Sequence, residues 1–186
     1  MNELENLQIL DMKFSDIAQV QEIARRLNLS HWSDNDYKDE IEKKNSITKV
    51  GKLKNDVVAF IIARLIIFNN FIPIFSDSVS KKEMGGFPKT YETGSYGLKQ
   101  IDVDIEIYNI SVVEHLQKRG IGMKLLETLY DAGTKYKSAK IWLEVRESNA
   151  NAINFYKANK FEVCYQRSNF YVNPIENGLV MKLEIN

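Results

Sequence analysis

From residue 101 to the end of the chain, short segments with the two-residue period of a strand alternate with longer segments that have the period of a helix. The clearest strand covers residues 101–107, where Ile and Val alternate with three carboxylates. The other expected elements are strands at 139–145, 161–167 and 179–185 and helices at 120–135 and 149–159. Strands separated by helices of this length predict a mixed α/β sheet with helices on both faces.

The N-terminal part of the chain predicts two further helices and two further strands. Apolar residues at helical spacing indicate a helix over residues 15–27, with its first serine placed as the cap. A second helix begins at Ser33, where Asp36 completes a capping box. Residues 47–50 and 56–68 are rich in Val and Ile and are expected to pair as antiparallel strands.

Residues 69–100 differ from the rest in composition, because they hold two of the three prolines and four of the nine glycines. They indicate a long insertion between two strands of a single domain that spans residues 1–186. The insertion ends about eleven residues before Val112, which is roughly 36 Å along an extended strand. A partner-binding arm or a neutral expansion is therefore expected rather than a lid.

The sequence has 25 Lys and Arg against 25 Asp and Glu, so its formal net charge is zero. No nucleic-acid partner is expected, because such binding depends on a basic face. One cysteine and two histidines provide neither a disulfide framework nor a metal-binding cluster. The first residues lack the pattern of a signal peptide, and the longest apolar segment, residues 57–68, is interrupted by Arg64. A cytoplasmic protein without a membrane span is therefore expected.

The helix expected at 120–135 starts with two glycines, in the sequence Gln117-Lys118-Arg119-Gly120-Ile121-Gly122. The N–H groups at a helix start favour an anion, and Lys118 and Arg119 add positive charge there. The segment lacks the third glycine of a dinucleotide-binding loop and the Lys-Ser/Thr ending of a triphosphate-binding loop. Taken alone, it fits either an anion site or a simple glycine-rich helix entry.

A second candidate site joins the strand at 139–145 to the helix that follows. Glu144 points to the opposite strand face from Leu143, and Tyr156 lies on the next helix, seven residues after Asn149. A carboxylate at a strand end and a phenol on the next helix supply a base and an acid for one cleft. Spacing alone favours a surface glutamate and a core tyrosine over a catalytic pair.

Three acidic residues, Asp102, Asp104 and Glu106, share one face of the strand at 101–107. Such a face is commonly solvated in an antiparallel sheet. It also suits a groove for a basic peptide, and the spacing does not decide between the two interpretations.

Several segments together carry a family resemblance: Asn109-Ile110-Ser111-Val112, Gln117-x-x-Gly120-x-Gly122, Leu143-Glu144-Val145-Arg146-x-Ser148-Asn149-x-x-Ala152-Ile153-x-Phe155-Tyr156, Arg167-x-Asn169-Phe170-Tyr171 and His31-Trp32-Ser33. They resemble the GNAT superfamily of acetyl-CoA-dependent N-acetyltransferases, and within it the ribosomal-protein-alanine N-acetyltransferases of the RimI type. The resemblance covers nearly the whole chain except residues 69–100. It implies a GNAT-like fold with a central, mostly antiparallel sheet.

By that resemblance, acetyl-CoA is the co-substrate and no metal takes part. The residues expected to bind it are Ile110, Ser111, Val112, Gln117, Lys118, Arg119, Gly120, Ile121, Gly122, Met123 and Asn149. The resemblance makes Glu144 the general base and Tyr156 the general acid toward the departing thiolate. It also implies that Trp32, Glu106 and Tyr171 bind the acceptor.

The resemblance implies acetyl transfer to the N-terminal α-amine of a protein, with an alanine-starting ribosomal protein as the expected partner. An α-amino group, with a pKa near 8, loses its proton more readily than lysine does. The alternatives are N-acetylation of a small amine or a lysine side chain, or a non-catalytic module that binds coenzyme A. One departure is Lys160-Phe161 in place of the family's Gly-Phe, so Asn159 is expected to take the left-handed position after the helix.

Overall fold

The computed structural model describes residues 4–29, 32–68 and 101–185. The insertion expected at 69–100 and the expected contribution of His31 lie outside these residues. The helices and strands in chain order are β1 (Leu7–Asp11), α1 (Ile17–Arg26), α2 (Asp34–Glu42), β2 (Ser46–Leu53), β3 (Asp56–Phe68), β4 (Asp102–Val112), α3 (Ile121–Gly133), β5 (Ser138–Arg146), α4 (Ala150–Ala158), β6 (Glu162–Val172) and β7 (Ile175–Ile185).

The described strands form one seven-stranded sheet in the order β1-β2-β3-β4-β5-β7-β6. Every neighbouring pair is antiparallel except β4 and β5, which are parallel, so the predicted mixed and mostly antiparallel sheet is confirmed. The prediction lacks β1, whose five residues are mixed in polarity and whose place is set by pairing with β2. β6 and β7 are also longer than predicted, because they continue beyond a register shift into a long hairpin.

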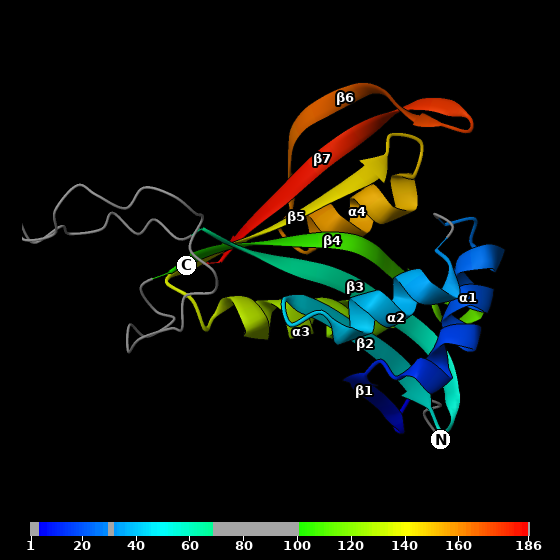
Figure 1. Cartoon of the computed structure of the whole chain (residues 1–186). Coiled ribbons are helices and arrows are strands. Elements are labelled where there is room, and N and C mark those ends of the chain that lie inside the picture. Colours follow the sequence, from blue (N-terminus) through cyan, green and yellow to red (C-terminus); the bar gives the residue numbers. More distant parts are fainter. Residues whose placement is uncertain (1–3, 30–31, 69–100, 186) are drawn as a thin grey trace, which may run out of the picture.

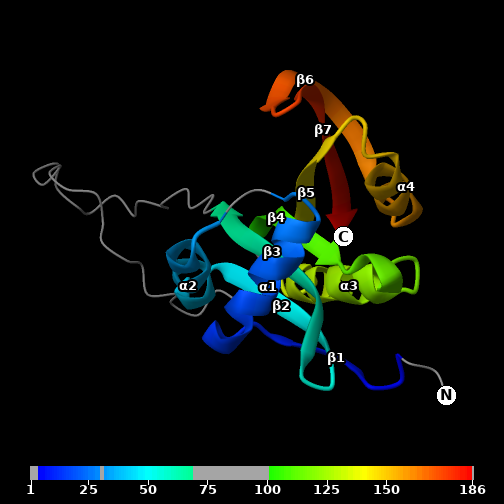
Figure 2. The same ribbon diagram turned by 90° about the vertical axis from the view of Figure 1, so that its right-hand side faces the viewer.

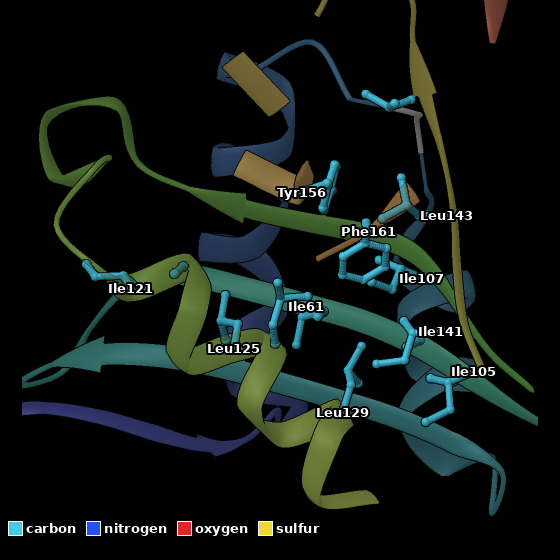
Figure 3. Packing of buried hydrophobic residues seen from close by; sticks show 14 of the residues in the cluster. Ile61, Ile105, Ile107, Ile121, Leu125, Leu129, Ile141, Leu143, Tyr156 and Phe161 are labelled. Atoms are coloured by element: carbon cyan, nitrogen blue, oxygen red, sulfur yellow. The ribbon is translucent and has the colours of Figure 1, made fainter. Parts of the chain in front are cut away.

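Helices cover both faces of the sheet, and each face has its own core (Figures 1 and 2). On one face, α1 and α2 pack on β2 and β3 through buried residues such as Val20, Tyr37 and Phe60. On the other face, α3 and α4 share a larger core with the central strands (Figure 3). Residues of this second core include Ile61, Ile105, Leu125, Leu129, Ile141, Tyr156 and Phe161.

The sheet splits between its two parallel strands. The ladder between β4 and β5 runs from Asp102 opposite Ser138 to Ile107 opposite Leu143 and goes no further. β4 has one extra residue, Tyr108, at that point relative to β3, so a bulge turns the strand just where the ladder ends. β4 then continues beside β3, and β5 continues beside β7. We call β1, β2, β3 and β4 the N-terminal arm and β5, β7 and β6 the C-terminal arm; Figure 1 shows the arms diverging from a common end.

Helix ends confirm one sequence prediction and correct two. The capping box at Ser33 and Asp36 is present. The expected cap at the first helix is wrong: Ser15 lies in a 3-10 turn, Phe14–Asp16, and α1 begins at Ile17. After α4, Lys160 rather than Asn159 is left-handed (φ 67°), because the Asn159 side chain stays with the helix and donates to the Phe155 carbonyl oxygen at 2.8 Å.

Candidate active site

The turn between β4 and α3 is built around two left-handed residues, Lys118 (φ 59°) and Gly120 (φ 87°). Gly120 is the N-cap of α3, a helix of 13 residues, and its φ strongly favours glycine. The first N–H groups of an α-helix have no partner within the helix and attract negative charge. The predicted anion-binding turn therefore has suitable backbone geometry.

Gly122 has a packing role as well. A Cβ at this position would lie 3.0 Å from the ring of Phe155 in α4, which is closer than side chains ordinarily approach. The absence of a side chain thus lets α3 and α4 pack tightly beneath the split in the sheet. The two glycines of the turn serve different purposes, one for backbone conformation and one for helix packing.

At the end of β4, alternate residues point their backbone N–H and C=O groups away from β3, toward the space between the two arms. The Val113 N–H donates to the Val58 carbonyl oxygen at 2.9 Å, on the β3 side. Because successive residues of a strand point their backbone groups to opposite sides, those of Val112 point toward the opening. Consistently, the Gln117 side chain donates to the Val112 carbonyl oxygen at 3.0 Å. Ile110 has the same orientation as Val112 in the ladder, whereas Ser111 is turned toward β3.

Glu144 lies on β5, one residue beyond the end of the parallel ladder. Its Oε1 accepts a charge-assisted hydrogen bond from Arg167 on β6. The Arg167 guanidinium also lies over the Phe170 ring, 3.9 Å from its centre. The structure thus places Glu144 just beyond the point where the sheet splits, with one oxygen held by the β6–β7 hairpin.

Tyr156 is buried on α4 between the rings of Phe155 and Phe161, whose centres are 5.3 and 5.5 Å away. Burial raises the pKa of the Tyr156 phenol well above its ordinary value, and the nearby Tyr171 raises it further. The pKa of Tyr171 is raised by its own burial and then by the Glu144 carboxylate. Tyr171 therefore interacts electrostatically with both Glu144 and Tyr156.

Arg146 fastens the β6–β7 hairpin to this group. Its guanidinium lies 4.2 Å from the centre of the Tyr171 ring and donates to the carbonyl oxygens of Asn173 (3.0 Å) and Pro174 (3.3 Å). It also pairs with Glu176 at 3.1 Å. The hairpin residues therefore reach the site through an arginine two positions after Glu144.

The other predicted acceptor residues lie on the N-terminal arm. Trp32 meets Tyr108 edge-on, with ring centres 6.3 Å apart, and packs on Tyr37 at 5.4 Å. Glu106 accepts a hydrogen bond from the Tyr108 hydroxyl at 2.8 Å. Tyr108 thus contacts both Trp32 and Glu106, which lie far apart in the sequence.

Asn149 has a role in the fold that the sequence prediction did not include. Its side-chain oxygen accepts from the Ala152 N–H at 3.1 Å and caps α4. This cap fixes the start of the helix that carries Tyr156.

Comparison with known proteins identifies the family. Residues 17–161 match the acetyltransferase (GNAT) family. The chain belongs to this family. A [ribosomal protein bS18]-alanine N-acetyltransferase of Escherichia coli (strain K12) is 36% identical over an alignment of 94 residues, which covers 49% of this chain and 64% of that protein. The chain thus spans somewhat less than two thirds of the length of this curated relative.

Solved structures show the same fold at lower identity. The ribosomal-protein-S18-alanine N-acetyltransferase from Escherichia coli has a TM-score of 0.67 and 22% identity, covering 97% of this chain and 94% of its own. Arabidopsis thaliana Naa50 in complex with the bisubstrate analogue CoA-Ac-MVNAL has a TM-score of 0.70 and 21% identity, covering 97% and 99%. The predicted GNAT-like fold is therefore confirmed.

Three residues of this GNAT site escaped the sequence reasoning: Arg167 and Arg146 as partners of site residues, and Tyr108. Both arginines stand in segments that carried the family resemblance, so their positions were visible but their contacts were not. Tyr108 had no sequence signal beyond its place next to Asn109.

Within the described ranges, no group of three His, Cys, Asp or Glu side chains is suited to a metal ion. No helix among those residues has the length and apolar character to cross a membrane.

Proposed function

We propose that this GNAT protein transfers the acetyl group of acetyl-CoA to the N-terminal α-amine of a protein. The observation that carries the proposal is the split between β4 and β5. The glycine turn follows β4 after the split, and Glu144 lies on β5 one residue beyond it. Tyr171 interacts electrostatically with both Glu144 and Tyr156. An alanine-starting ribosomal protein is the first candidate acceptor, because a relative bears that activity in its name. The cytoplasm is the expected location, as for a ribosomal substrate.

In this proposal, the coenzyme lies along the opening. Backbone N–H groups between Lys118 and Met123 hold the pyrophosphate at the start of α3. The backbone of Ile110 and Val112 lines the thioester, and the Val112 N–H stabilises the oxyanion of the tetrahedral intermediate, whereas the backbone of Ser111, also assigned to the coenzyme from the sequence, is turned toward β3. Arg119, Gly120, Ile121 and Gly122 lie between Lys118 and Met123, and the other residues assigned to the coenzyme are Gln117 and Asn149. The outward-facing backbone of Val112 supports this arrangement.

The chemistry needs a proton acceptor and a proton donor. The amine nitrogen attacks the thioester carbon, Glu144 accepts a proton from the amine directly or through a water, and the C–S bond breaks as Tyr156 gives its proton to the thiolate. Arg167 occupies Oε1 of Glu144, which leaves Oε2 for the amine or the water. The Tyr156 phenol is protonated at neutral pH and so has a proton to give, and its raised pKa makes it a weaker acid than an exposed tyrosine.

The acceptor binds where the two arms face each other. Trp32 and Glu106 contribute from the N-terminal arm, and Tyr171 contributes from the β6–β7 hairpin. A protein N-terminus suits this place, since the aromatic rings can enclose a first side chain while the carboxylates attract the amine.

The deciding experiment is acetylation of short peptides by acetyl-CoA, read by mass spectrometry. The peptides begin with Ala, Ser or Met, and a fourth has a blocked N-terminus and an internal lysine. We expect acetylation at the α-amine, with the Ala peptide preferred. Modification of the lysine peptide alone would favour a side-chain acetyltransferase, and binding of coenzyme A with no transfer to peptides or small amines would favour a binding module.

Glu144→Gln tests the base in the same assay, with Glu127→Gln on the exposed side of α3 as the matched control. We expect Glu144→Gln to lower kcat about 100-fold while the Kd of coenzyme A changes little. An unchanged kcat would remove Glu144 from the proposed mechanism.

A further inference from the structure

Four side chains form a continuous chain of contacts from the inner side of α2 to the open face of β4. Glu40 on α2 accepts from the Arg64 Nε at 2.7 Å and also from Arg64 Nη2. The Arg64 guanidinium lies over the Tyr108 ring, 4.6 Å from its centre, and Nη1 lies 3.5 Å from the Tyr108 hydroxyl. Tyr108 in turn donates to Glu106. Glu40, Arg64 and Tyr108 lie outside the segments that carried the family resemblance.

The inner end of this chain is firmly anchored. Glu40 is 1% exposed, and it accepts further bonds from Ser46 (2.7 Å) and Lys43 (2.9 Å). Burial opposes its ionisation, but the bonds from Arg64, Ser46 and Lys43 outweigh that effect and lower the pKa of Glu40 to about 2. Because two bonds to a fixed carboxylate orient the guanidinium, Arg64 offers a rigid platform to the Tyr108 ring.

The outer end of this chain of contacts, Glu106, lies close to the point where the sheet splits between β4 and β5. Glu106 is opposite Trp142 in the parallel ladder, so the next positions on the same face are Tyr108 on β4 and Glu144 on β5. Trp32 also contacts Tyr108, edge-on, with ring centres 6.3 Å apart. Burial raises the pKa of the Tyr108 phenol, so the hydroxyl remains a donor to Glu106 at neutral pH.

Glu106 and Glu144 differ in whether a cationic side chain forms an ion pair with the carboxylate. Glu144 is paired with Arg167. Among the described residues Glu106 has no ion-pair partner, and its bond comes from a neutral phenol. Among the described residues, Glu106 therefore presents a negative charge without an ion pair beside the place where an acceptor amine must arrive, as an ammonium at neutral pH.

We infer that Arg64 and Tyr108 are positioning residues that hold the Glu106 carboxylate toward the acceptor ammonium, with Glu40 fixing Arg64 from within. This inference rests on the proposed function and concerns acceptor binding. Glu106 docks the ammonium, and Glu144 takes the proton. The phenol limits the rotation of Glu106, so less conformational freedom is lost when the acceptor binds.

The test is a double-mutant cycle between Tyr108→Phe and Glu106→Gln, read as KM for the peptide, KM for acetyl-CoA, and kcat. Tyr108→Phe keeps the ring over Arg64 and removes only the hydroxyl, so we expect KM for the peptide to rise about tenfold, as for a lost hydrogen bond to a charged group. KM for acetyl-CoA and kcat should stay within about twofold. In the Glu106→Gln background, Tyr108→Phe should have little further effect.

Arg64→Lys probes the next step inward, since it keeps a cation beside Glu40 but loses the planar two-bond contact. We expect a rise of a few-fold in KM for the peptide, and no additional rise when Tyr108→Phe is already present. Tyr136→Phe, a half-buried tyrosine before β5, is the matched control and should change nothing.

Two results would overturn the inference in an active protein: an unchanged KM for the peptide in Tyr108→Phe, or additive effects of Tyr108→Phe and Glu106→Gln. A purely structural role would instead lower thermal stability and disturb acetyl-CoA binding equally. If the unmodified protein acetylates no peptide, the proposed function fails and this inference fails with it, and that result is distinct from an unchanged KM.

Discussion

The N-terminal arm has α1 and α2 packed on the sheet face opposite α3, whereas no described helix covers the corresponding face of the C-terminal arm (Figure 2). The two carboxylates of the site, Glu106 on the N-terminal arm and Glu144 on the C-terminal arm, are also held in different ways. Glu106 is connected to the buried Glu40 through Tyr108 and Arg64. Glu144 is held by Arg167, whose side chain is 47% exposed on the outermost strand.

The comparison separates two ways of supporting a site. On the N-terminal arm, the support runs into a core, so its loss should cost stability. On the C-terminal arm, the support comes from a long hairpin tied down by a few polar contacts, so its loss should cost activity with little change in stability. Substitutions at five positions test how the site is built and supported.

The largest effect is expected from Tyr156→Phe. Removing the phenol deletes the proposed proton donor, and kcat should fall about 100-fold with acetyl-CoA affinity nearly unchanged. Steady-state kinetics with the Ala peptide measure the loss. Tyr130→Phe, which removes a half-buried phenol from α3, is the control. Equal kcat in both variants would exclude Tyr156 as the acid.

Glu40→Gln should be the most destabilising change on the N-terminal arm, by roughly 2 kcal/mol at neutral pH. The folded pKa of Glu40, about 2, lies below its ordinary value of 4.5. Its ionised form therefore contributes stability above about pH 4.5, and this contribution is lost as the pH falls toward 2.

Urea unfolding at several pH values measures this effect. The stability difference between Glu40→Gln and the unmodified protein should shrink steadily below about pH 4.5. Glu42→Gln, an exposed position on the same helix, should follow the unmodified protein throughout. A gap that stays constant with pH would show that Glu40 does not contribute through its charge.

Arg146→Met should loosen the hairpin of the C-terminal arm. It removes the bonds to Asn173 and Pro174 and the contact with Tyr171. We expect KM for the peptide to rise about tenfold, with a smaller loss of stability than in Glu40→Gln. Arg26→Met on the exposed side of α1 is the control. A stability loss without a change in KM would contradict the proposed division between the arms.

The smallest effect is expected in the turn between β4 and α3, at the end of β4 where the two arms have separated. Gly120→Ala introduces a Cβ that meets nothing within 4 Å, so its cost is the left-handed backbone alone, about 1 kcal/mol. If the turn holds the pyrophosphate, the Kd of coenzyme A should rise about fivefold by calorimetry. Gly122→Ala, which instead presses on Phe155, should lower stability more than affinity. The same response in both variants would argue against separate roles for the two glycines.

Sequence reasoning succeeded where the relevant residues are close along the chain. The alternating strand at 101–107, the glycine turn and the capping box at Ser33 are local patterns, and local periodicity and capping chemistry suffice to predict them. It failed for β1, for Ser15 and for the left-handed residue after α4. In each of these, the outcome depends on a neighbouring element or on a competing side-chain bond.

The amino-acid sequence by itself determined the strand and helix order beyond residue 101 and the family, because contiguous strand–turn–helix segments carry both. Only the tertiary structure decided how the site is supported. The pairs Glu144–Arg167 and Arg64–Tyr108 join residues 23 and 44 positions apart. Their contacts follow from strand register and from the bulge at Tyr108, and a shift of register by one residue would turn these side chains to the opposite face. Local periodicity contains no information on that register. Only the pairing of the strands in the tertiary structure therefore determines which side chains hold Glu106 and Glu144.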